Sequence, residues 1–431
     1  MPSLLSRLLP CLRWLHSYDR RTLTSDVVAA VIVTVMLIPQ SLAYALLAGL
    51  PPETGLYASI LPLVAYAVFG TSMTMAVGPV AVISLMTAAA AGKVAASGAM
   101  DALQAAILLA WLSGGFLLLL GLLRVGFVAN FLSHPVVAGF ITASGIIIAL
   151  GQLKHLLGID AEGDTLPELL HTLLLSIADT NPATFAIGGG SLLFLLWARS
   201  GLKALLRRTT LSDFAINLLV RIAPVFTVIV TGALAWQLRL DQSGVQLMGA
   251  IPAGLPQLQL PLADANVARQ LLLPAVMLSI IGYVESVSVG KTLAARRRQK
   301  IDPDQELIGL GAANITAGLS GGFPVTGGFS RSVVNFDAGA QTPAASFFTA
   351  IGIAVATLLL TGLLAWLPTA TLAATIIIAV LSLVDLSILR RTWNYSVSDF
   401  VAVATTMVVT LLFGVEIGVS CGVGASLMLH L

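Results

Sequence analysis

Apolar runs long enough to cross a lipid bilayer recur along almost the whole of this 431-residue chain. A helix rises about 1.5 Å per residue, so roughly 20 apolar residues cross about 30 Å of hydrocarbon. Hydrophobic residues make up 57% of the chain and charged residues only 10%, which excludes an ordinary water-soluble core. The sequence therefore predicts an all-α integral membrane protein in which nearly every segment belongs to the membrane domain.

The hydropathy predicts about fourteen transmembrane spans. They lie near 24–44, 56–70, 79–92, 102–122, 132–151, 183–198, 216–236, 270–290, 304–319, 329–337, 344–364, 367–384, 397–413 and 414–430. With a cytoplasmic N-terminus, most Lys- and Arg-rich connections fall inside, and the acidic connection from about 155 to 182 falls outside. This positive-inside bias supports the even number of spans and the orientation.

Two of these spans, which begin near Pro79 and Phe329, are too short to cross the bilayer alone. Each follows an extended stretch that contains glycine and proline, "TSMTMAVGP" at 71–79 and "SGGFPVTGGFS" at 320–330. They are the third and tenth spans, so each is third in a group of seven. Because seven is odd, the two groups would enter the membrane in opposite orientations, as the inverted repeats of secondary transporters do.

The sequence thus predicts a 7+7 inverted repeat in which spans 3 and 10 are half-helices preceded by short strands. The predicted segments are a cytoplasmic N-terminal segment 1–23, a first repeat 24–240 with spans 1–7, an extracytoplasmic connection 241–269, and a second repeat 270–431 with spans 8–14. The small residues of "GLGAANITAGLSGG" at 309–322 predict close helix packing.

The two breaks predict an anion site, because unwound backbone at membrane depth persists only where protein or a watery cavity satisfies it. Gly78 permits a tight approach and Pro79 suits a first helical turn, so a helix should begin near residue 79. In the second repeat, the flexible approach and capping hydroxyls are expected from Thr326, Gly327, Gly328 and Ser330. Two helix N-termini directed at one place attract a negative solute.

Two ionisable residues lie inside predicted spans, where charges are costly and usually functional. Arg331, at the start of the tenth span, would add a full positive charge to the anion site, or would instead turn toward the surface or pair with Glu285. Glu285, in the eighth span, would carry a proton, hold a sodium ion, or serve as a fixed partner for Arg331. The sequence favours the proton over sodium.

In the first span, Pro39 can loosen the helix so that Gln40 and Tyr44 present polar groups at mid-membrane. Tyr44 would either close over a ligand or anchor the helix at the interface. Catalytic, nucleotide-binding and metal-binding patterns such as H-E-x-x-H are not found in the sequence, and the two cysteines lie at opposite ends of the chain. We therefore expect neither enzymatic activity, nor a cofactor or metal, nor a nucleic-acid partner.

Several long stretches resemble the SulP family of anion transporters in family order. They are "IPQSLAYALLAGLPPETGLYAS", "MAVGPVAVISLM", "FLSHPVVAGFITASGIIIALGQLK", "VGKTLAARRRQKIDPDQELIGLGAANITAGLSGGFPVTGGFSRSVVN" and "LFGVEIGVSCGVGASL". The resemblance implies a core domain and a gate domain, a homodimer, elevator-like movement of the core past the gate, and substrates among sulfate, bicarbonate, chloride and dicarboxylates. It also implies a cytoplasmic STAS domain after the membrane domain, and this chain stops at Leu431 without one.

The resemblance also assigns residues. The substrate-binding residues that it implies are Gln40, Tyr44, Val77, Gly78, Pro79, Val80, Phe329, Ser330 and Arg331. Glu285 matches the coupling position. Bacterial sodium–bicarbonate relatives have an aspartate there and a threonine four residues later, where this chain has Val289.

The resulting expectation is a secondary active importer of a small anion, with sulfate–proton symport favoured, in the lipid of a bacterial inner membrane. The alternatives are a sodium-coupled bicarbonate transporter, a proton-coupled dicarboxylate transporter, and an uncoupled anion channel or exchanger.

Overall fold

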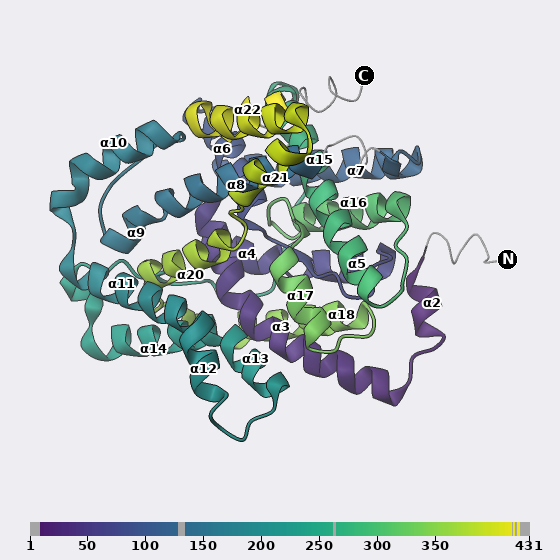
Figure 1. Ribbon diagram of the computed structural model, residues 1–431, viewed down its shortest axis with the longest axis horizontal. Helices are drawn as coiled ribbons and strands as arrows, with labels where there is room; N and C mark the ends of the chain where they lie inside the picture. Colours follow the sequence, from purple (N-terminus) through teal and green to yellow (C-terminus); the bar gives the residue numbers. More distant parts are fainter. Residues whose placement is uncertain (1–8, 128–133, 262–263, 416, 419, 423–431) are drawn as a thin grey trace. The chain divides into compact units, whose positions relative to one another are not determined.

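The computed structural model describes residues 9–127, 134–261, 264–415, 417–418 and 420–422. The chain divides into two compact units, of which the first combines residues 1–133 with 254–358 and the second combines 134–253 with 359–431. Each unit therefore takes one segment from each half of the chain. The elements named in the described residues are helices apart from one pair of two-residue strands, which confirms the helical expectation (Figure 1).

The first unit contains two runs of helices, each interrupted by a strand. The run from the first half is α2 (Cys11–Leu15), α3 (Arg20–Leu47), α4 (Pro52–Tyr57), α5 (Leu61–Phe69), β1 (Val77–Gly78), α6 (Ala81–Ala96) and α7 (Ala102–Leu122). The run from the second half is α15 (Ala265–Arg296), α16 (Pro303–Leu319), β2 (Thr326–Gly327), α17 (Phe329–Asp337) and α18 (Ala344–Leu359). Helix α3 stays continuous through Pro39, so the expected loosening does not break it.

Glycines set the distance between α7 and α16, which pack together in the first unit. A Cβ atom on Gly114 would lie 2.8 Å from the backbone nitrogen of Ile315, and a Cβ atom on Gly311 would lie 2.9 Å from the backbone nitrogen of Leu118. Any larger residue would push the two backbones apart. The close packing that was predicted for the 309–322 stretch is therefore confirmed.

The second unit contains the remaining helices. They are α8 (His134–Gly151), α9 (Leu153–Leu157), α10 (Leu166–Ser176), η2 (Ile177–Asp179), α11 (Pro182–Trp197), η3 (Ala198–Leu202), α12 (Lys203–Leu206), α13 (Asp213–Arg221), α14 (Ala223–Leu238), η4 (Leu240–Ser243), α19 (Thr361–Leu364), α20 (Thr369–Leu381), α21 (Ser387–Tyr395) and α22 (Val397–Phe413). The predicted acidic connection at 155–182 is thus partly helical, since α10 lies within it.

Helices lie at each predicted span between residues 24 and 413. Five helices among the described residues are long and apolar enough to cross a membrane alone, or six if the bent pair Ala215–Arg221 and Ala223–Leu238 is one span. Shorter apolar helices include Ala81–Ala96 and Thr369–Leu381. The count of fourteen spans remains a prediction. The last predicted span and the first eight residues lie largely or wholly outside the described residues.

Candidate functional site

The two predicted breaks meet in the first unit. Strand β1 pairs with β2 in antiparallel fashion, with Val77 opposite Gly327 and Gly78 opposite Thr326. The backbone amide of Gly328 continues the pairing by donating to the carbonyl of Ala76 at 3.4 Å. The extended backbone on each side therefore satisfies part of the other, which is what non-helical backbone at membrane depth requires. Short strands before the third and tenth predicted spans were predicted and are confirmed.

Side chains from neighbouring helices hold this strand pair. The hydroxyl of Thr326 donates to the carbonyl of Gly282 at 2.6 Å and lies 2.7 Å from the hydroxyl of Ser286, which accepts from the amide of Gly327 at 2.8 Å. These bonds attach β2 to α15 at the residue that directly follows Glu285. From α17, Ser332 accepts from the amide of Ala76 at 3.1 Å. The positions of β1 and β2 are thus fixed by α17 and α15.

Helices α6 and α17 begin shortly after the strand pair, and neither first turn is capped by a side chain. Helix α6 begins at Ala81 after Val80, two residues later than the predicted start near Pro79. Helix α17 begins at Phe329 after Gly328. The expectation that Thr326 and Ser330 cap α17 is wrong, because the Thr326 hydroxyl is engaged by α15 instead. Uncapped first-turn amides can bind a ligand.

The guanidinium of Arg331 lies against both strand–helix junctions. A Cβ atom on Gly78 would lie 2.5 Å from Nη1 of Arg331, and one on Gly328 would lie 3.0 Å from its Nε and Nη2. The side chain is only 3% exposed, yet neither Nη atom has a hydrogen-bond partner within the described part of the chain. A buried cation without partners is costly, so this arrangement favours an anion that completes it.

Glu285 and Gln40 show the same lack of partners. Buried oxygens of both side chains, Oε2 of Glu285 and Oε1 of Gln40, accept no hydrogen bond from any described residue. The charges of Glu285 and Arg331 attract each other, and both interact electrostatically with the buried Tyr44. No ion pair joins Glu285 to Arg331 in the residues that the structure describes. The structure therefore does not form the direct clamp that was one of the alternatives.

The other predicted site residues differ in exposure. Val77, Gly78 and Pro79 are buried, and Val80 is partly buried. Phe329 and Ser330 are exposed, although they belong to the same first turn as the buried Arg331. All nine predicted substrate residues and Glu285 lie in the first unit.

Two fully buried carboxylates were missed by the sequence reasoning, Asp26 on α3 and Glu306 on α16. Glu306, in the first turn of α16, is fully buried and accepts four hydrogen bonds. The donors are the Tyr66 hydroxyl at 2.7 Å, the Thr71 amide and hydroxyl at 2.7 and 2.5 Å, and the Ser72 amide at 3.2 Å. An acidic residue near a helix start is usually explained by the helix dipole, so no local pattern singles out Glu306. Glu306 fixes the chain between α5 and β1.

A helical membrane protein with paired, uncapped helix N-termini and an unpaired buried arginine has the features of a membrane anion transporter. Residues 23–406 match the sequence model of the sulfate permease family, and the chain belongs to that family. The members are transporters and not enzymes, as the sequence led us to expect.

A curated relative is the chloroplastic sulfate transporter 4.1 of Arabidopsis thaliana, which is 37% identical over 422 residues. The match covers 97% of this chain and 60% of the relative, so the chain spans less than two thirds of that protein. Among solved structures, that of SLC26A9 aligns over 99% of this chain and 68% of its own, with a TM-score of 0.89 and 25% identity. The transmembrane domain of the cyanobacterium bicarbonate transporter BicA covers 94% of this chain and 99% of its own, with a TM-score of 0.79 and 22% identity, and shows a shared fold.

Proposed function

We propose that this chain imports sulfate by proton symport. The observation that carries the proposal is the Arg331 guanidinium, which is buried without a hydrogen-bond partner in the described residues beside two uncapped helix N-termini. Sulfate has four oxygens, which can accept from the first-turn amides and the guanidinium together. The name of the Arabidopsis relative supports sulfate as the substrate.

The proposed binding residues are those named from the sequence. The first turns of α6 and α17, approached through Val77, Gly78, Pro79, Val80, Phe329 and Ser330, surround the anion from two sides. Arg331 supplies the full positive charge. Gln40 donates from α3 through its amide, and Tyr44 closes the site on the same helix.

Glu285 is the proposed proton carrier. Its Oε2 atom is buried and has no partner in the described residues, so it can take up and release a proton without breaking an existing bond. Val289, one turn later on α15, is buried and apolar and offers no oxygen to a sodium ion. Protonation of Glu285 would leave the charge of Arg331 fully available to the anion, which links the two ligands.

The proposed architecture is a 7+7 inverted repeat with repeats at 24–240 and 270–431 joined by the 241–269 connection. The two-unit division supports it, because each unit is made from corresponding parts of the two repeats. The first unit would be the core, which moves the site across the membrane by an elevator-type movement, and the second unit would be the gate. We further propose a homodimer in a bacterial inner membrane, with segment 1–23 in the cytoplasm because most Lys- and Arg-rich connections then face inside.

Uptake of radiolabelled sulfate into proteoliposomes tests the coupling. With an acidic exterior, the unmodified chain should accumulate sulfate. Glu285→Gln should lose proton-driven accumulation and keep sulfate–sulfate counterflow. Glu53→Gln, on α4, is the matched control and should retain both activities. Accumulation that persists in Glu285→Gln would refute the coupling role.

Binding of sulfate to the purified chain tests the site separately. Arg331→Ala should weaken sulfate binding at least about 100-fold, since a buried charge-assisted pair is lost. Unchanged binding would contradict the site whatever the coupling ion is.

The second candidate substrate is bicarbonate, which the fold shared with BicA favours. It would use the same helix N-termini. Competition of labelled sulfate uptake by bicarbonate, fumarate and chloride at two pH values, with and without sodium, separates the candidates. Unitary currents in single-channel recordings would instead identify an uncoupled channel.

A further inference from the structure

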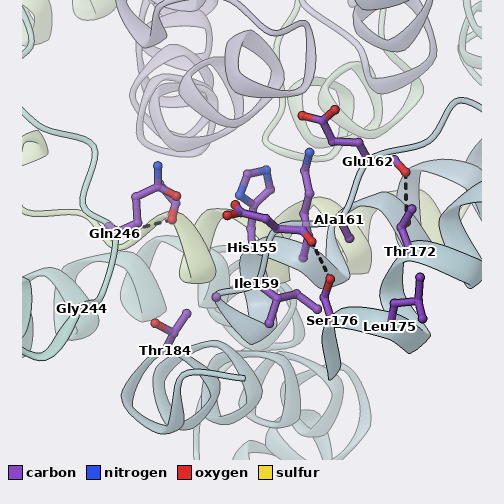
Figure 2. A pocket seen from close by; sticks show the side chains of 14 residues that line it. His155, Ile159, Ala161, Glu162, Thr172, Leu175, Ser176, Thr184, Gly244 and Gln246 are labelled. Carbon is purple, nitrogen blue, oxygen red and sulfur yellow. Dashed lines mark hydrogen bonds between the residues drawn. The ribbon is translucent and has the colours of Figure 1, made fainter. Parts of the chain in front are cut away.

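The second unit contains an open cavity of about 560 Å³ that the transport proposal does not use. It lies among the end of α9, the segment that follows it, α10, the start of α11 and the start of α20 (Figure 2). Its volume is within the usual range for a small-molecule site. Its walls hold one cation, Lys154, the imidazole of His155, and two carboxylates, Asp160 and Glu162.

These opposite charges do not neutralise one another. Within this fully described part of the second unit, no ion pair or hydrogen bond engages the charged ends of Lys154, Asp160 or Glu162. A cation in the last turn of α9 can be explained by the helix dipole alone. Two exposed carboxylates that face the same cavity have no such explanation. Lys154 is the one cation in the lining, so the pair favours a further cation from outside the chain.

The wall that carries the carboxylates is preorganised. Residues 159–162 alternate between buried and exposed, so Ile159 and Ala161 enter an apolar cluster while Asp160 and Glu162 share the opposite side. Hydroxyls of α10 hold this segment from behind, since Ser176 donates to the carbonyl of Asp160 at 2.8 Å and Thr172 donates to that of Glu162 at 2.9 Å (Figure 2). The two carboxylates are therefore held on a fixed backbone.

A buried hydroxyl also lines the cavity without a partner. Thr184, near the start of α11, is 1% exposed, and its Oγ1 atom has no hydrogen bond to any described residue. The opposite wall is tied down as well, because Thr369 donates from both its amide and its hydroxyl to the carbonyl of Gln246, at 3.0 and 3.1 Å. An unsatisfied buried hydroxyl in a charged cavity whose walls are held by hydrogen bonds indicates a polar ligand.

The position of the cavity in the membrane identifies the source of that ligand. Its residues 158–176 connect two apolar helices of spanning length, Pro135–Leu157 and Pro182–Leu206, so they lie at a membrane–water boundary. Helix α10 turns large apolar side chains outward beside the cavity, and Leu175 lines it while remaining 69% exposed. Lipid headgroups and the first acyl carbons occupy this depth.

We propose that this cavity binds the phosphoethanolamine headgroup of a phospholipid. The phosphate would contact Lys154 and His155, and the primary ammonium would donate to Asp160 and Glu162. A phosphatidylcholine headgroup has no N–H group to donate, and its quaternary ammonium is usually bound by aromatic rings, whereas the only ring in this lining is the imidazole of His155. Phosphatidylglycerol carries no cation, and the two carboxylates would repel it.

Native mass spectrometry after reconstitution in equal amounts of phosphatidylethanolamine and phosphatidylcholine tests the proposal. The unmodified chain should retain phosphatidylethanolamine in preference. In the double variant Asp160→Asn/Glu162→Gln this preference should fall about fivefold. That is the size expected when the lipid ammonium loses two partly exposed charge pairs. Asp179→Asn, an exposed carboxylate on the same connection outside the lining, is the matched control and should leave the preference unchanged.

A second arm separates the lipid from a dissolved zwitterion. Soluble phosphoethanolamine is added to the chain in phosphatidylcholine nanodiscs, and thermal unfolding is followed. Stabilisation by phosphatidylethanolamine but not by the soluble compound supports the lipid site. No lipid preference in the unmodified chain, an equal loss in the Asp179→Asn control, or stabilisation only by the soluble compound would overturn it.

Discussion

Two of the polar centres in the first unit treat a buried carboxylate in opposite ways. The open centre, which comprises Gln40, Glu285 and Arg331, has charged and polar atoms without partners in the described residues. The closed centre, which comprises Tyr66, Thr71, Ser72 and Glu306, gives one carboxylate four hydrogen bonds. Helices α15 and α16 follow each other in the chain, and each contributes one of these carboxylates.

The difference separates a structural carboxylate from one that is available for transport. A fully bonded carboxylate stabilises the fold and has no acceptor left for another ligand. An unpartnered one weakens the fold slightly and can respond to a proton or to a neighbouring anion. Substitutions in the closed centre should therefore act on stability, and those in the open centre on binding and coupling.

The largest expected effect is that of Glu306→Gln. The amide replaces an acceptor oxygen with a donor, which then faces another donor and leaves buried groups unsatisfied. We expect a loss of about 3 kcal/mol in the free energy of unfolding. Unfolding by SDS titration measures this loss. A loss no greater than that of Glu285→Gln would contradict the structural role of Glu306.

Tyr66→Phe removes one donor from the closed centre and leaves the other three. The hydrogen bond from the Tyr66 hydroxyl goes to a charged acceptor, so about 2 kcal/mol of stability should be lost. Tyr57→Phe is the matched control, because the Tyr57 hydroxyl has no hydrogen bond among the described residues. The same titration applies, and equal losses in the two variants would show that ring packing rather than Glu306 is responsible.

Gly78→Ala should affect the open centre through binding. The added Cβ would lie 2.5 Å from Nη1 of Arg331, so the guanidinium must shift by several tenths of an ångström. We expect sulfate affinity to fall about tenfold, which is about 1.4 kcal/mol, with little change in stability. Gly92→Ala, on the helix α6 that follows β1, adds a Cβ that meets no atom within 4 Å, and this variant should bind sulfate normally. Isothermal titration calorimetry with sulfate distinguishes the two variants. Normal sulfate affinity in Gly78→Ala would show that Arg331 does not bind the anion.

Glu285→Gln should change the free energy of unfolding by less than about 1 kcal/mol, since the lost charge has no hydrogen-bond partner on Oε2. The SDS titration measures this together with Glu306→Gln. A destabilisation as large as that of Glu306→Gln would mean that Glu285 is a structural partner of Arg331 and not a coupling group.

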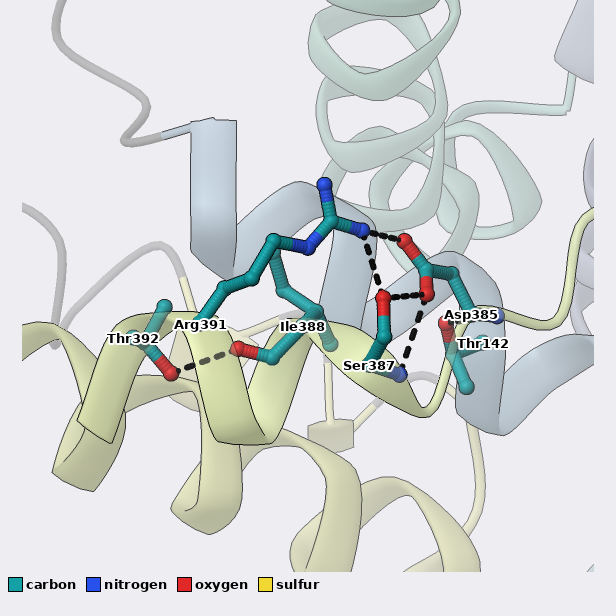
Figure 3. A network of polar contacts seen from close by, with 6 residues as sticks. All are labelled: Thr142, Asp385, Ser387, Ile388, Arg391 and Thr392. Carbon is teal, nitrogen blue, oxygen red and sulfur yellow. Dashed lines mark hydrogen bonds and ion pairs between the residues drawn. The ribbon is translucent and has the colours of Figure 1, made fainter. Parts of the chain in front are cut away.

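A surface carboxylate of the second unit should show the smallest effect. Asp385 accepts from the amide and hydroxyl of Ser387 and pairs with Arg391 (Figure 3). The Ser387 bonds, with a smaller contribution from Arg391, hold the pKa of Asp385 below its usual value. The stabilisation from Asp385 is therefore fully present above the pKa that this carboxyl has in the unfolded chain. It is lost as the pH falls through the lower pKa that the carboxyl has in the folded chain.

Asp385→Asn should cost less than about 0.5 kcal/mol at neutral pH, and nothing at a pH where the wild-type carboxyl is protonated. Thermal unfolding of the two chains at neutral and acidic pH tests this. A larger loss at acidic pH than at neutral pH would reverse the expected sign.

Much of the fold followed from hydropathy and from glycine and proline. The short strands, the helices that follow them and the close packing of the 309–322 stretch all depend on local residue types, which the sequence displays directly. Helix starts were less accurate, as at α6, because Val80 is extended and Pro79 therefore lies outside the helix. Thr326 was misassigned because its hydroxyl bonds to α15, about 40 residues away in sequence, and no local pattern reports such a contact.

The candidate site was predictable where a residue is unusual for its environment. Arg331 and Glu285 were identified as charges inside apolar spans. Glu306 was missed because an acidic residue beside Pro303 and Asp304 looks like an ordinary helix start, and its donors come from residues 66–72. The assignment of each residue to substrate or coupling ion remains a prediction.

The pairing of β1 with β2 also orders events during synthesis of the protein. Val77 and Gly78 leave the ribosome long before Thr326 and Gly327 exist, so the first strand must wait in the membrane for its partner. A ribosome-bound intermediate that ends before residue 326 should therefore keep the backbone of Val77 and Gly78 accessible to water or to the insertion machinery, and completion of the second strand should close it.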